Sequence, residues 1–351
     1  MPAIVRSLLG ASLALACASA FAAALESPPL ETLPRWAVPE SYALDLRIDP
    51  AQDTFSGNVS IKLQLKQPSD HVWLHGKDLK VEKVAVTETK GKTHAAKYVN
   101  AAPQAGVVRV DFGSELAAQE LTLSFVFKAP YNDQLQGLYK VEHAGKPYVM
   151  TQMEPISARY AFPGFDEPDF KTPFDLRITL PEHDVAVANT TQVKSAKADK
   201  GWKTVTFATT KPLPTYLVAY MVGPWDINVA PDIPPSPWRT QPLPLRGVAA
   251  AGQAHRMAHI LGETPVIIQT LEDYYGFGYP FDKLDLAAVP DFSAGAMENA
   301  GLVTFRDWLL LLDPDSAQRY VQSSFNVTAH ELAHQWTGDT VTMTWWNDLW
   351  L

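Results

Sequence analysis

The sequence predicts two domains of different class: an N-terminal antiparallel β domain, shaped as a sandwich or saddle, and a following domain of mixed helices and strands. The chain has 351 residues, of which 46% are hydrophobic, so it can bury two cores. Short alternating runs dominate residues 42–228, and helical patterns appear only after a proline-rich stretch. We place the β domain at residues 30–240 and the second domain at residues 246–351.

The β domain is predicted from six runs in which apolar and polar residues alternate, as they do in strands with one buried face. No helical pattern of convincing length interrupts these runs. An antiparallel sandwich or saddle-shaped arrangement of sheets is therefore expected. The runs are YALDLRIDP, GNVSIKLQLKQ, GVVRVDFG, ELTLSFVFKAP, FDLRITLPE and WKTVTFATT.

A change of composition marks the predicted boundary near residue 240. Residues 230–247, APDIPPSPWRTQPLPLRG, contain six prolines. Proline has a fixed φ and no amide hydrogen, so this density of prolines excludes a helix or a central strand. The segment is expected to be a linker or a crossover that follows a sheet edge.

The second domain is expected to contain both helices and strands. Residues 250–281 fit a helix with a break near residues 262–265, and KLDLAAVPDF and GLVTFRDWLLLL fit strands. DSAQRYVQSSFNVTAHELAHQWTG fits one long helix, with Asp315 or Ser316 as its N-cap and Gly338 at its C-terminal end. Apolar residues at helical spacing predict that this helix buries a stripe composed of Ala317, Val321, Phe325, Leu332 and Trp336.

The long helix also carries two histidines with metal-ligand spacing. His330 and His334 are four residues apart, slightly more than one helical turn, so both imidazoles can bind one Zn²⁺ from the same face. Glu331 projects about 100° away from His330 around the helix, where it can accept a proton from a zinc-activated water. A polar helix face that carries this pattern by chance is the alternative. Catalytic zinc usually has three protein ligands, and spacing alone names no third one.

The first 24 residues, MPAIVRSLLGASLALACASAFAAA, predict a secretory signal peptide. One positive charge, Arg6, precedes an apolar stretch, and small residues allow cleavage after Ala20 or Ala24. A secreted or periplasmic protein is therefore expected. The only cysteine, Cys17, falls in this segment, so the mature chain would have no thiol for catalysis. Lipidation of Cys17, as in a lipoprotein signal, is the alternative.

Charge and hydropathy argue against two other classes of protein. The net charge is −9, which argues against a nucleic-acid partner. After the first 24 residues there is no apolar run of about 18 residues, so no membrane span is expected there. Nothing in the composition indicates the oligomeric state.

Three stretches, in order, resemble the M1 family of zinc aminopeptidases, gluzincin peptidases that include aminopeptidase N and leukotriene A4 hydrolase. HELAHQWTGDTVT resembles the extended signature of the family, and GAMEN, residues 295–299, resembles its second hallmark. TQMEPISARYAFPGFDEPDFKTPF, residues 151–174, is similar to the segment that ends the β domain of the family. The resemblance extends from about residue 30 to residue 351. It implies that the second domain is the incomplete start of a thermolysin-like α+β catalytic domain.

The resemblance implies a metallo-aminopeptidase that binds one Zn²⁺ and acts on peptides with a free N-terminus. It implies that His330 and His334 are zinc ligands and that Glu331 is the general base. The third zinc ligand of the family, a glutamate, would fall at position 353, beyond residue 351. We therefore expect a fragment of a longer enzyme that binds zinc weakly and has little or no peptidase activity by itself.

The resemblance also implies how the peptide is bound. Glu298 would bind the α-ammonium group of the substrate with Glu154 as its partner, and Gln152 would line the pocket for the first side chain. Backbone groups around Gly295 and Ala296 would hold the peptide as a strand. The full set of implied substrate-binding residues is Gln152, Glu154, Gly295, Ala296, Met297, Glu298 and Asn299.

Two other functions are compatible with the sequence. A stop codon directly after residue 351 would favour a non-catalytic β-domain binding or scaffold protein with an incomplete peptidase domain. An epoxide hydrolase that uses the same zinc, like leukotriene A4 hydrolase, is the enzymatic alternative, although nothing in the sequence supports a lipid-specific tunnel.

Overall fold

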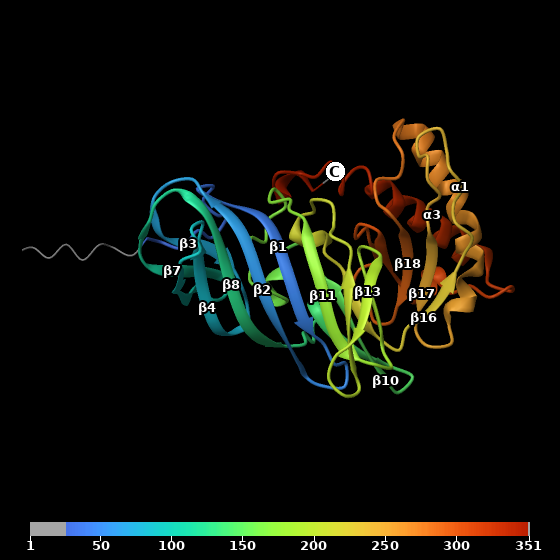
Figure 1. Ribbon diagram of the computed structural model, residues 1–351. Coiled ribbons are helices and arrows are strands. Elements are labelled where there is room, and N and C mark those ends of the chain that lie inside the picture. The colour runs from blue at the N-terminus through green and yellow to red at the C-terminus, as the bar shows by residue number, and fades with distance from the viewer. Residues whose placement is uncertain (1–25, 350–351) are drawn as a thin grey trace, which may run out of the picture.

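The computed structural model describes residues 26–349, so the expected signal peptide and Cys17 lie outside the described part of the chain. Figure 1 shows two parts that follow each other along the chain. The first, coloured blue to yellow, consists of curved β-sheets, and the second, coloured orange to red, contains a sheet covered by helices. Both predicted classes of structure are thus confirmed. Within residues 26–349, no helix combines the length and apolar character that a membrane crossing requires.

The largest sheet contains eight strands: β1 (Ala37–Arg47), β2 (Thr54–Leu65), β4 (Lys80–Glu88), β5 (Thr93–Ala95), β8 (Gln119–Pro130), β11 (Phe174–Pro181), β13 (Gln192–Lys197) and β14 (Trp202–Phe207). In space they follow the order β13-β14-β11-β1-β2-β8-β4-β5. All neighbours are antiparallel except β1 and β11, which are parallel. Alternate residues of β2 are buried, as the sequence pattern predicts.

Two smaller sheets complete the N-terminal β domain. One contains β9 (Gly137–His143), β10 (Lys146–Gln152), β12 (Val185–Ala188) and β15 (Tyr220–Gly223), and the other contains β3 (Ser69–His75), β6 (Lys97–Ala102) and β7 (Val107–Leu116). Side chains from all three sheets share one hydrophobic core, as in a sandwich. Between residues 26 and 225, the structure has only two short 3₁₀ turns as helical elements, η1 (Ala158–Tyr160) and η2 (Thr215–Leu217).

The second domain is built on a five-stranded sheet with two buried faces. Its strands are β16 (Asp226–Val229), β17 (Leu245–Ala249), β18 (Leu284–Val289), β19 (Ala296–Met297) and β20 (Leu302–Arg306), in the spatial order β16-β17-β18-β20-β19. The central strands β17, β18 and β20 are parallel. Along β18, Leu284, Leu286 and Ala288 pack with the helices, whereas Ala287 and Val289 join the core of the β domain. The sheet is therefore packed between the β domain and the helices.

The strand pairing places the start of the second domain before residue 240, where the sequence predicted the boundary. β16 pairs with β17 in antiparallel fashion, so the proline-rich residues between them connect two neighbouring strands of one sheet. Backbone bridges join Ile233 to Leu243 and Ser236 to Arg239 inside this segment. The sheet thus changes between β15 and β16. The prolines do lie at a sheet edge, which is one of the two expected arrangements.

The first long helix shows no break. After a 3₁₀ turn, η3 (Ala254–Met257), helix α1 (Ala258–Tyr275) continues through Gly262 and Pro265, so the predicted break is wrong. Buried residues lie on both sides of Pro265, and the Thr264 hydroxyl donates a hydrogen bond to the Ile260 carbonyl at 2.7 Å. Packing of this face outweighs the one backbone hydrogen bond that proline cannot donate.

The run GLVTFRDWLLLL is only partly a strand. It forms β20 up to Arg306 and then the short helix α2 (Asp307–Leu310), which packs against β18 and the next helix, α3 (Gln318–His334). The prediction of one long strand is wrong because the chain turns to bury Leu309 and Leu310 against the helical core.

Helix α3 begins later and buries a different face than the sequence predicts. Its N-cap position is Ala317, without a side-chain cap, whereas the Ser316 hydroxyl accepts a hydrogen bond from the Asp313 amide at 2.8 Å. Ala317 and Phe325 are exposed, so the predicted apolar stripe is wrong at these positions, although Leu332 and Trp336 are buried. Most of the buried residues on this face are polar: besides Leu332 they are Ser324, Thr328, Glu331 and Gln335.

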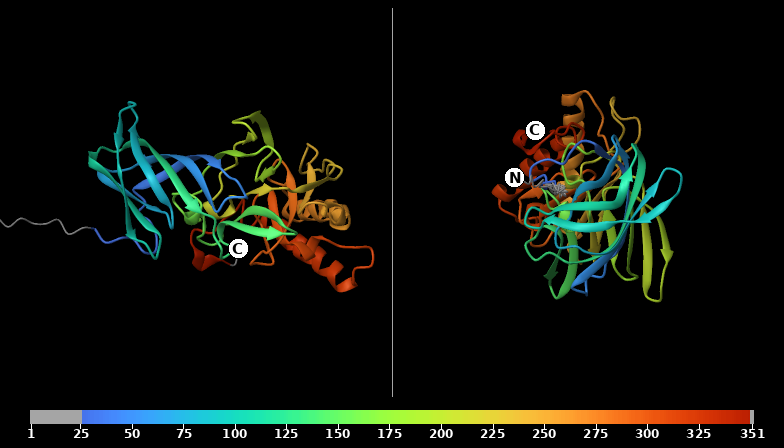
Figure 2. Two further views of the ribbon diagram at one scale, coloured as in Figure 1. Left: turned by 90° about the horizontal axis from the view of Figure 1, so that it is seen from below. Right: turned by 90° about the vertical axis from the view of Figure 1, so that its left-hand side faces the viewer.

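The chain after α3 returns to the β domain. In Figures 1 and 2 the red end of the described chain lies beside the β domain. A short 3₁₀ turn, η4 (Trp346–Asp348), places Trp346 edge-on against Tyr216, with ring centroids 5.2 Å apart. The Lys171 side chain donates hydrogen bonds to the carbonyls of Asp339 and Thr340 at 2.8 and 3.0 Å. The end of α3 is thus held between both domains.

Candidate active site

The last turn of α3 brings two imidazole nitrogens together. The Nε2 atoms of His330 and His334 are 3.2 Å apart. His334 Nδ1 lies 2.9 Å from the Thr337 carbonyl oxygen. Because a carbonyl only accepts hydrogen bonds, Nδ1 carries the proton and Nε2 presents its lone pair toward His330. A backbone carbonyl that fixes the tautomer in this way is typical of a histidine that binds a metal.

This arrangement fits zinc as far as two ligands allow. Burial and the neighbouring His334 lower the pKa of His330, which favours the neutral form that binds metals. Two converging imidazoles from one rigid helix are a common half of a tetrahedral zinc site. In the part of the chain that the structure describes, no group of three or more histidine, cysteine or carboxylate side chains gathers to hold a metal ion.

Four carboxyl groups from different segments interact electrostatically with one another, and Glu154 also interacts with His334. Glu154 follows β10 in the β domain, Glu298 follows the edge strand β19, Glu331 lies on α3, and Asp339 follows α3. Glu331 and Asp339 are almost fully buried, with 6% and 1% of their surfaces exposed, whereas Glu154 and Glu298 are half-buried. The fold therefore collects four titratable carboxyl groups at the junction of the two domains.

Burial raises the pKa values of all four carboxyl groups, and repulsion from neighbouring carboxylates raises those of Glu154, Glu331 and Asp339 further. Burial, then Glu298 and Glu154, raise the pKa of Glu331 to about 8. Burial and Glu298 raise the pKa of Glu154 to about 7, although His334 acts in the opposite direction. Burial also raises the pKa of Glu298, and burial together with Glu298 raises that of Asp339. A cation bound among them would relieve this repulsion, so the site is suited to a metal ion and an ammonium group.

The GAMEN segment offers its backbone rather than most of its side chains. β19 is the edge strand of its sheet, and it pairs with β20 through Ala296 opposite Phe305 and Met297 opposite Thr304. Gly295 is exposed and has open space where a side chain would be. Among residues 26–349 no strand pairs with the other edge of β19, so this edge can accept an extended peptide as an additional strand.

Two residues of the predicted substrate-binding set have side chains that are buried in the protein interior. The Met297 side chain is buried in the hydrophobic core. The Asn299 side chain is also buried, and its amide donates a hydrogen bond to the Thr304 hydroxyl at 3.2 Å. These side chains stabilise the turn that carries Glu298, which leaves only their backbone groups for a ligand.

Gln152 lies at the end of β10, two residues before Glu154. It is 5% exposed, and its Oε1 has no hydrogen-bond partner among the described residues. A buried amide oxygen without a partner costs free energy. A group that donates a hydrogen bond from a bound ligand would offset this cost, as the prediction for Gln152 requires.

Sequence reasoning missed Gln335, Asp339 and Lys171. Gln335 is fully buried and contacts the turn that carries Glu298, and Asp339 adds the fourth carboxylate. A signal for Gln335 was present, because it lies four residues after Glu331 and so shares its helix face. Lys171 and Asp339 are 168 residues apart in the chain, and no local pattern connects them.

The raised carboxyl pKa values predict an unusual pH dependence of stability for the metal-free protein. Below pH 4.5, Glu331 is neutral in the folded and the unfolded chain; above that, only the folded chain keeps its proton until about pH 8. The stability that this group contributes is therefore lost as the pH rises. Relative to wild type, Glu331→Gln should gain stability between pH 4.5 and 8, by up to about 1.4 kcal/mol per pKa unit of the shift. Urea unfolding with a chelator present measures this, and parallel pH profiles would contradict it.

Comparisons with known proteins cover almost the whole described chain. Residues 38–217 match the Peptidase M1 N-terminal domain, and residues 260–351 match the Peptidase family M1 domain. The chain is 35% identical to aminopeptidase M1-D of Oryza sativa subsp. japonica over 345 residues, which is 94% of this chain and 37% of that protein. It is 33% identical to the puromycin-sensitive aminopeptidase of Caenorhabditis elegans over 92% of this chain and 34% of that protein. It is also 33% identical to the glutamyl aminopeptidase of Mus musculus, over 91% of this chain and 34% of that protein. The chain thus spans about a third of the length of these relatives.

Proposed function

Because the chain belongs to the peptidase M1 family, we propose that it provides two parts of a zinc-dependent aminopeptidase. These are the metal-binding helix and the site that binds the amino terminus of the peptide substrate. The observation that supports this most strongly is the meeting of two domains at one site. The histidine pair and Glu331 come from α3, Glu298 comes from the edge of the sheet, and Glu154 comes from the β domain.

His330 and His334 would hold the zinc ion through their Nε2 atoms. When bound, the ion supplies Lewis acidity to the scissile carbonyl and to the attacking water. Glu331 removes a proton from the water as the new C–O bond forms. It then transfers a proton to the leaving nitrogen as the C–N bond breaks, so that atoms and charge balance. The raised pKa of Glu331 suits a group that must both accept and donate a proton near neutral pH.

Glu298 and Glu154 would bind the α-ammonium group of the peptide. Two half-buried carboxylates beside each other carry unfavourable repulsion that one cation relieves. With the ammonium group held by these carboxylates and the carbonyl at the metal held by the histidine pair, the first peptide bond would be the one that is cleaved. The free edge of β19 would align the peptide backbone.

Two further proposals concern location and the isolated polypeptide. Residues 1–24 would direct export to the periplasm or the medium. Residues 1–351 alone would bind zinc weakly and turn over peptides slowly or not at all, because only two ligands gather among the described residues. The second proposal can be tested by assaying this polypeptide with added zinc on an aminoacyl chromogenic amide. Rapid turnover would contradict it.

The full-length product of the gene tests the proposed function. We expect it to hydrolyse leucine p-nitroanilide and to reject N-acetyl-leucine p-nitroanilide, since the capped substrate has no ammonium group for Glu298. Activity should be lost with a chelator and restored by zinc. Equal rates on the capped and free substrates, or full activity without metal, would rule the proposal out. A stable protein that binds peptides but never cleaves them would support the scaffold alternative.

A further inference from the structure

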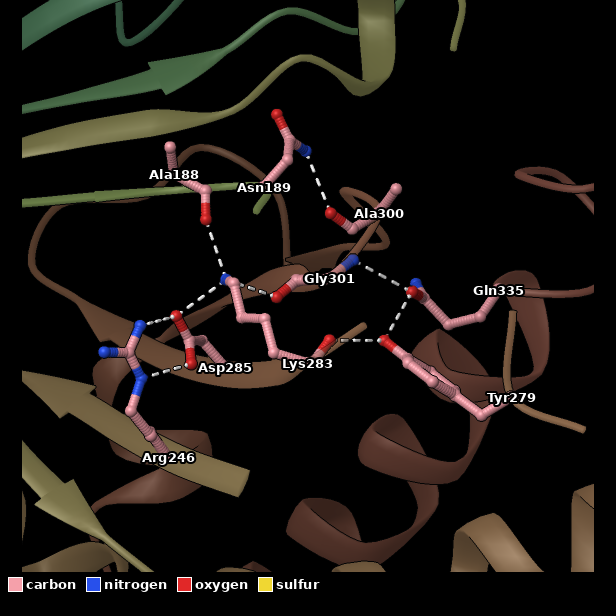
Figure 3. Close-up of polar contacts among 9 residues, drawn as sticks. All are labelled: Ala188, Asn189, Arg246, Tyr279, Lys283, Asp285, Ala300, Gly301 and Gln335. Atoms are coloured by element: carbon pink, nitrogen blue, oxygen red, sulfur yellow. Dashed lines mark hydrogen bonds and ion pairs between the residues drawn. The ribbon is translucent and has the colours of Figure 1, made fainter. Parts of the chain in front are cut away.

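The turn that follows Glu298 is fixed from three sides, as Figure 3 shows. The Gly301 amide donates a hydrogen bond to Gln335 Oε1 at 3.2 Å, and the Gly301 carbonyl accepts one from Lys283 Nζ at 2.7 Å. The Ala300 carbonyl accepts one from the Asn189 side chain at 2.9 Å. Gly301 has a φ of +69°, and a Cβ there would lie 2.5 Å from the Asn189 carbonyl oxygen. This segment therefore has little freedom to move.

Gln335 connects this turn to the metal-binding helix. It directly follows His334, and none of its surface is exposed. Its Nε2 donates a hydrogen bond to the Glu298 carbonyl oxygen at 2.7 Å, while its Oε1 accepts from the Gly301 amide and from the Tyr279 hydroxyl at 3.1 Å. One side chain thus bridges the proposed zinc ligand and the proposed ammonium-binding residue.

The backbone fixes the orientation of the Gln335 amide. The Gly301 N–H can only donate, so the oxygen of Gln335 must face it, and the Glu298 carbonyl can only accept, so the nitrogen must face that side. A flipped amide would place donor against donor and acceptor against acceptor in a buried site. The geometry therefore holds the Glu298 backbone at a defined position relative to His334.

Lys283 holds the opposite side of the same turn. Its ammonium group donates to the Ala188 carbonyl, the Gly301 carbonyl and the Asp285 carboxylate, each at 2.7 Å. Three acceptors use all three N–H groups, so Lys283 is charged in this arrangement. Asp285 in turn binds the Arg246 guanidinium through both carboxylate oxygens at 2.8 and 2.6 Å. The turn is thereby fixed to the sheet and to the β domain, and the hydrogen bonds of Gln335 connect it to the end of α3.

We propose that Gln335 is a positioning residue that sets the Glu298 carboxylate at the correct distance from the His330–His334 pair. This inference rests on the proposed aminopeptidase function. The first residue of a peptide has a fixed length, so its ammonium group and its carbonyl must reach both groups together. A displacement of about 1 Å in such a site reduces the rate by about 10²-fold. Gln335 acts through Glu298 and does not itself contact the peptide.

The test uses the full-length polypeptide with two substitutions of Gln335. Gln335→Met has a similar volume and lacks all three hydrogen bonds. Gln335→Glu keeps an oxygen toward the Gly301 amide and loses the donor to the Glu298 carbonyl. For leucine p-nitroanilide, we expect both variants to lower kcat/KM about 10-fold or more, with a raised KM. Zinc content and the zinc affinity, measured by chelator competition, should stay within about 3-fold of wild type.

Two control variants separate positioning from stability. Tyr131→Phe removes partly buried hydrogen bonds to the Asp49 backbone in the β domain, so it should lower Tm without raising KM. Ser324→Ala removes a buried hydroxyl on α3 that has no hydrogen-bond partner in residues 26–349, so it should change neither Tm nor KM. Variants of Gln335 that lower Tm but keep the wild-type KM would overturn the inference, as would loss of zinc. A wild-type enzyme that does not discriminate free from capped substrates would remove the proposed function and the inference together.

Discussion

Replacing Glu331 with glutamine in the full-length polypeptide is expected to reduce kcat about 10²–10⁴-fold, the range that a general base contributes. Glutamine has the same shape but cannot accept a proton from water. Glu331 is buried beside the histidine pair and not between the two Nε2 atoms, so zinc content should remain that of wild type. Steady-state kinetics on leucine p-nitroanilide and metal analysis of the same preparation measure both quantities.

A control and a contrary outcome make this prediction specific. Glu142→Gln removes one negative charge at an exposed position of β9, and it should leave kcat unchanged. If Glu331→Gln lost zinc together with activity, Glu331 would be a structural support of the metal site. If kcat fell less than about 10-fold, below the range for a general base, proton transfer by Glu331 would not limit the reaction.

The strands of the β domain were predictable because their signal is local. A strand with one buried face needs an apolar residue at every second position, and β2 meets this requirement along its whole length. The parallel pairing of β1 with β11 was not predictable, since it joins residues about 130 positions apart in the sequence. Likewise, the proline-rich segment looked like a linker because pairing of β16 with β17 lies outside any local window.

Helix α3 shows why hydrophobic periodicity fails at a functional site. Its buried face carries Ser324, Thr328, Glu331 and Gln335, and the apolar Phe325 is exposed. A helix that must present polar groups to a site buries them there, against the usual pattern. Periodicity therefore identified the helix and its buried Leu332 and Trp336, but it wrongly assigned Ala317 and Phe325 to the buried face. The histidine pair was predictable because its spacing depends only on helix geometry.

The meeting of Glu154 and Glu298 could be inferred only through a family resemblance. These residues are 144 positions apart and lie on a β domain and a sheet edge. No spacing rule connects them, because the packing of two domains brings them together. Gln335 and Asp339 lie within the signature stretch itself, yet their roles depend on a turn and a lysine from distant parts of the chain.

Replacing Glu298 with glutamine is expected to remove most of the preference for a free amino terminus. Loss of one partner from a buried, hydrogen-bonded charge pair costs about 2–5 kcal/mol. Glu298 is half-buried, so the lower end of this range applies. The kcat/KM for leucine p-nitroanilide should therefore fall about 30-fold, since 1.4 kcal/mol corresponds to a factor of ten. The rate on the N-acetylated substrate should change little, because that substrate never used the carboxylate. The ratio of the two kcat/KM values is the measurement.

The companion residue Glu154 allows the charge effect to be divided between the two carboxylates. Glu154 is half-buried, and burial, followed by repulsion from Glu298, raises its pKa to about 7. Glu154→Gln should therefore weaken binding of the free-amine substrate less than Glu298→Gln does, and the double variant should lose less than the sum of both effects, because the residues bind one ammonium group. Glu142→Gln again controls for net charge. An unchanged preference for the free amine in Glu298→Gln would assign the recognition of the amino terminus to other residues.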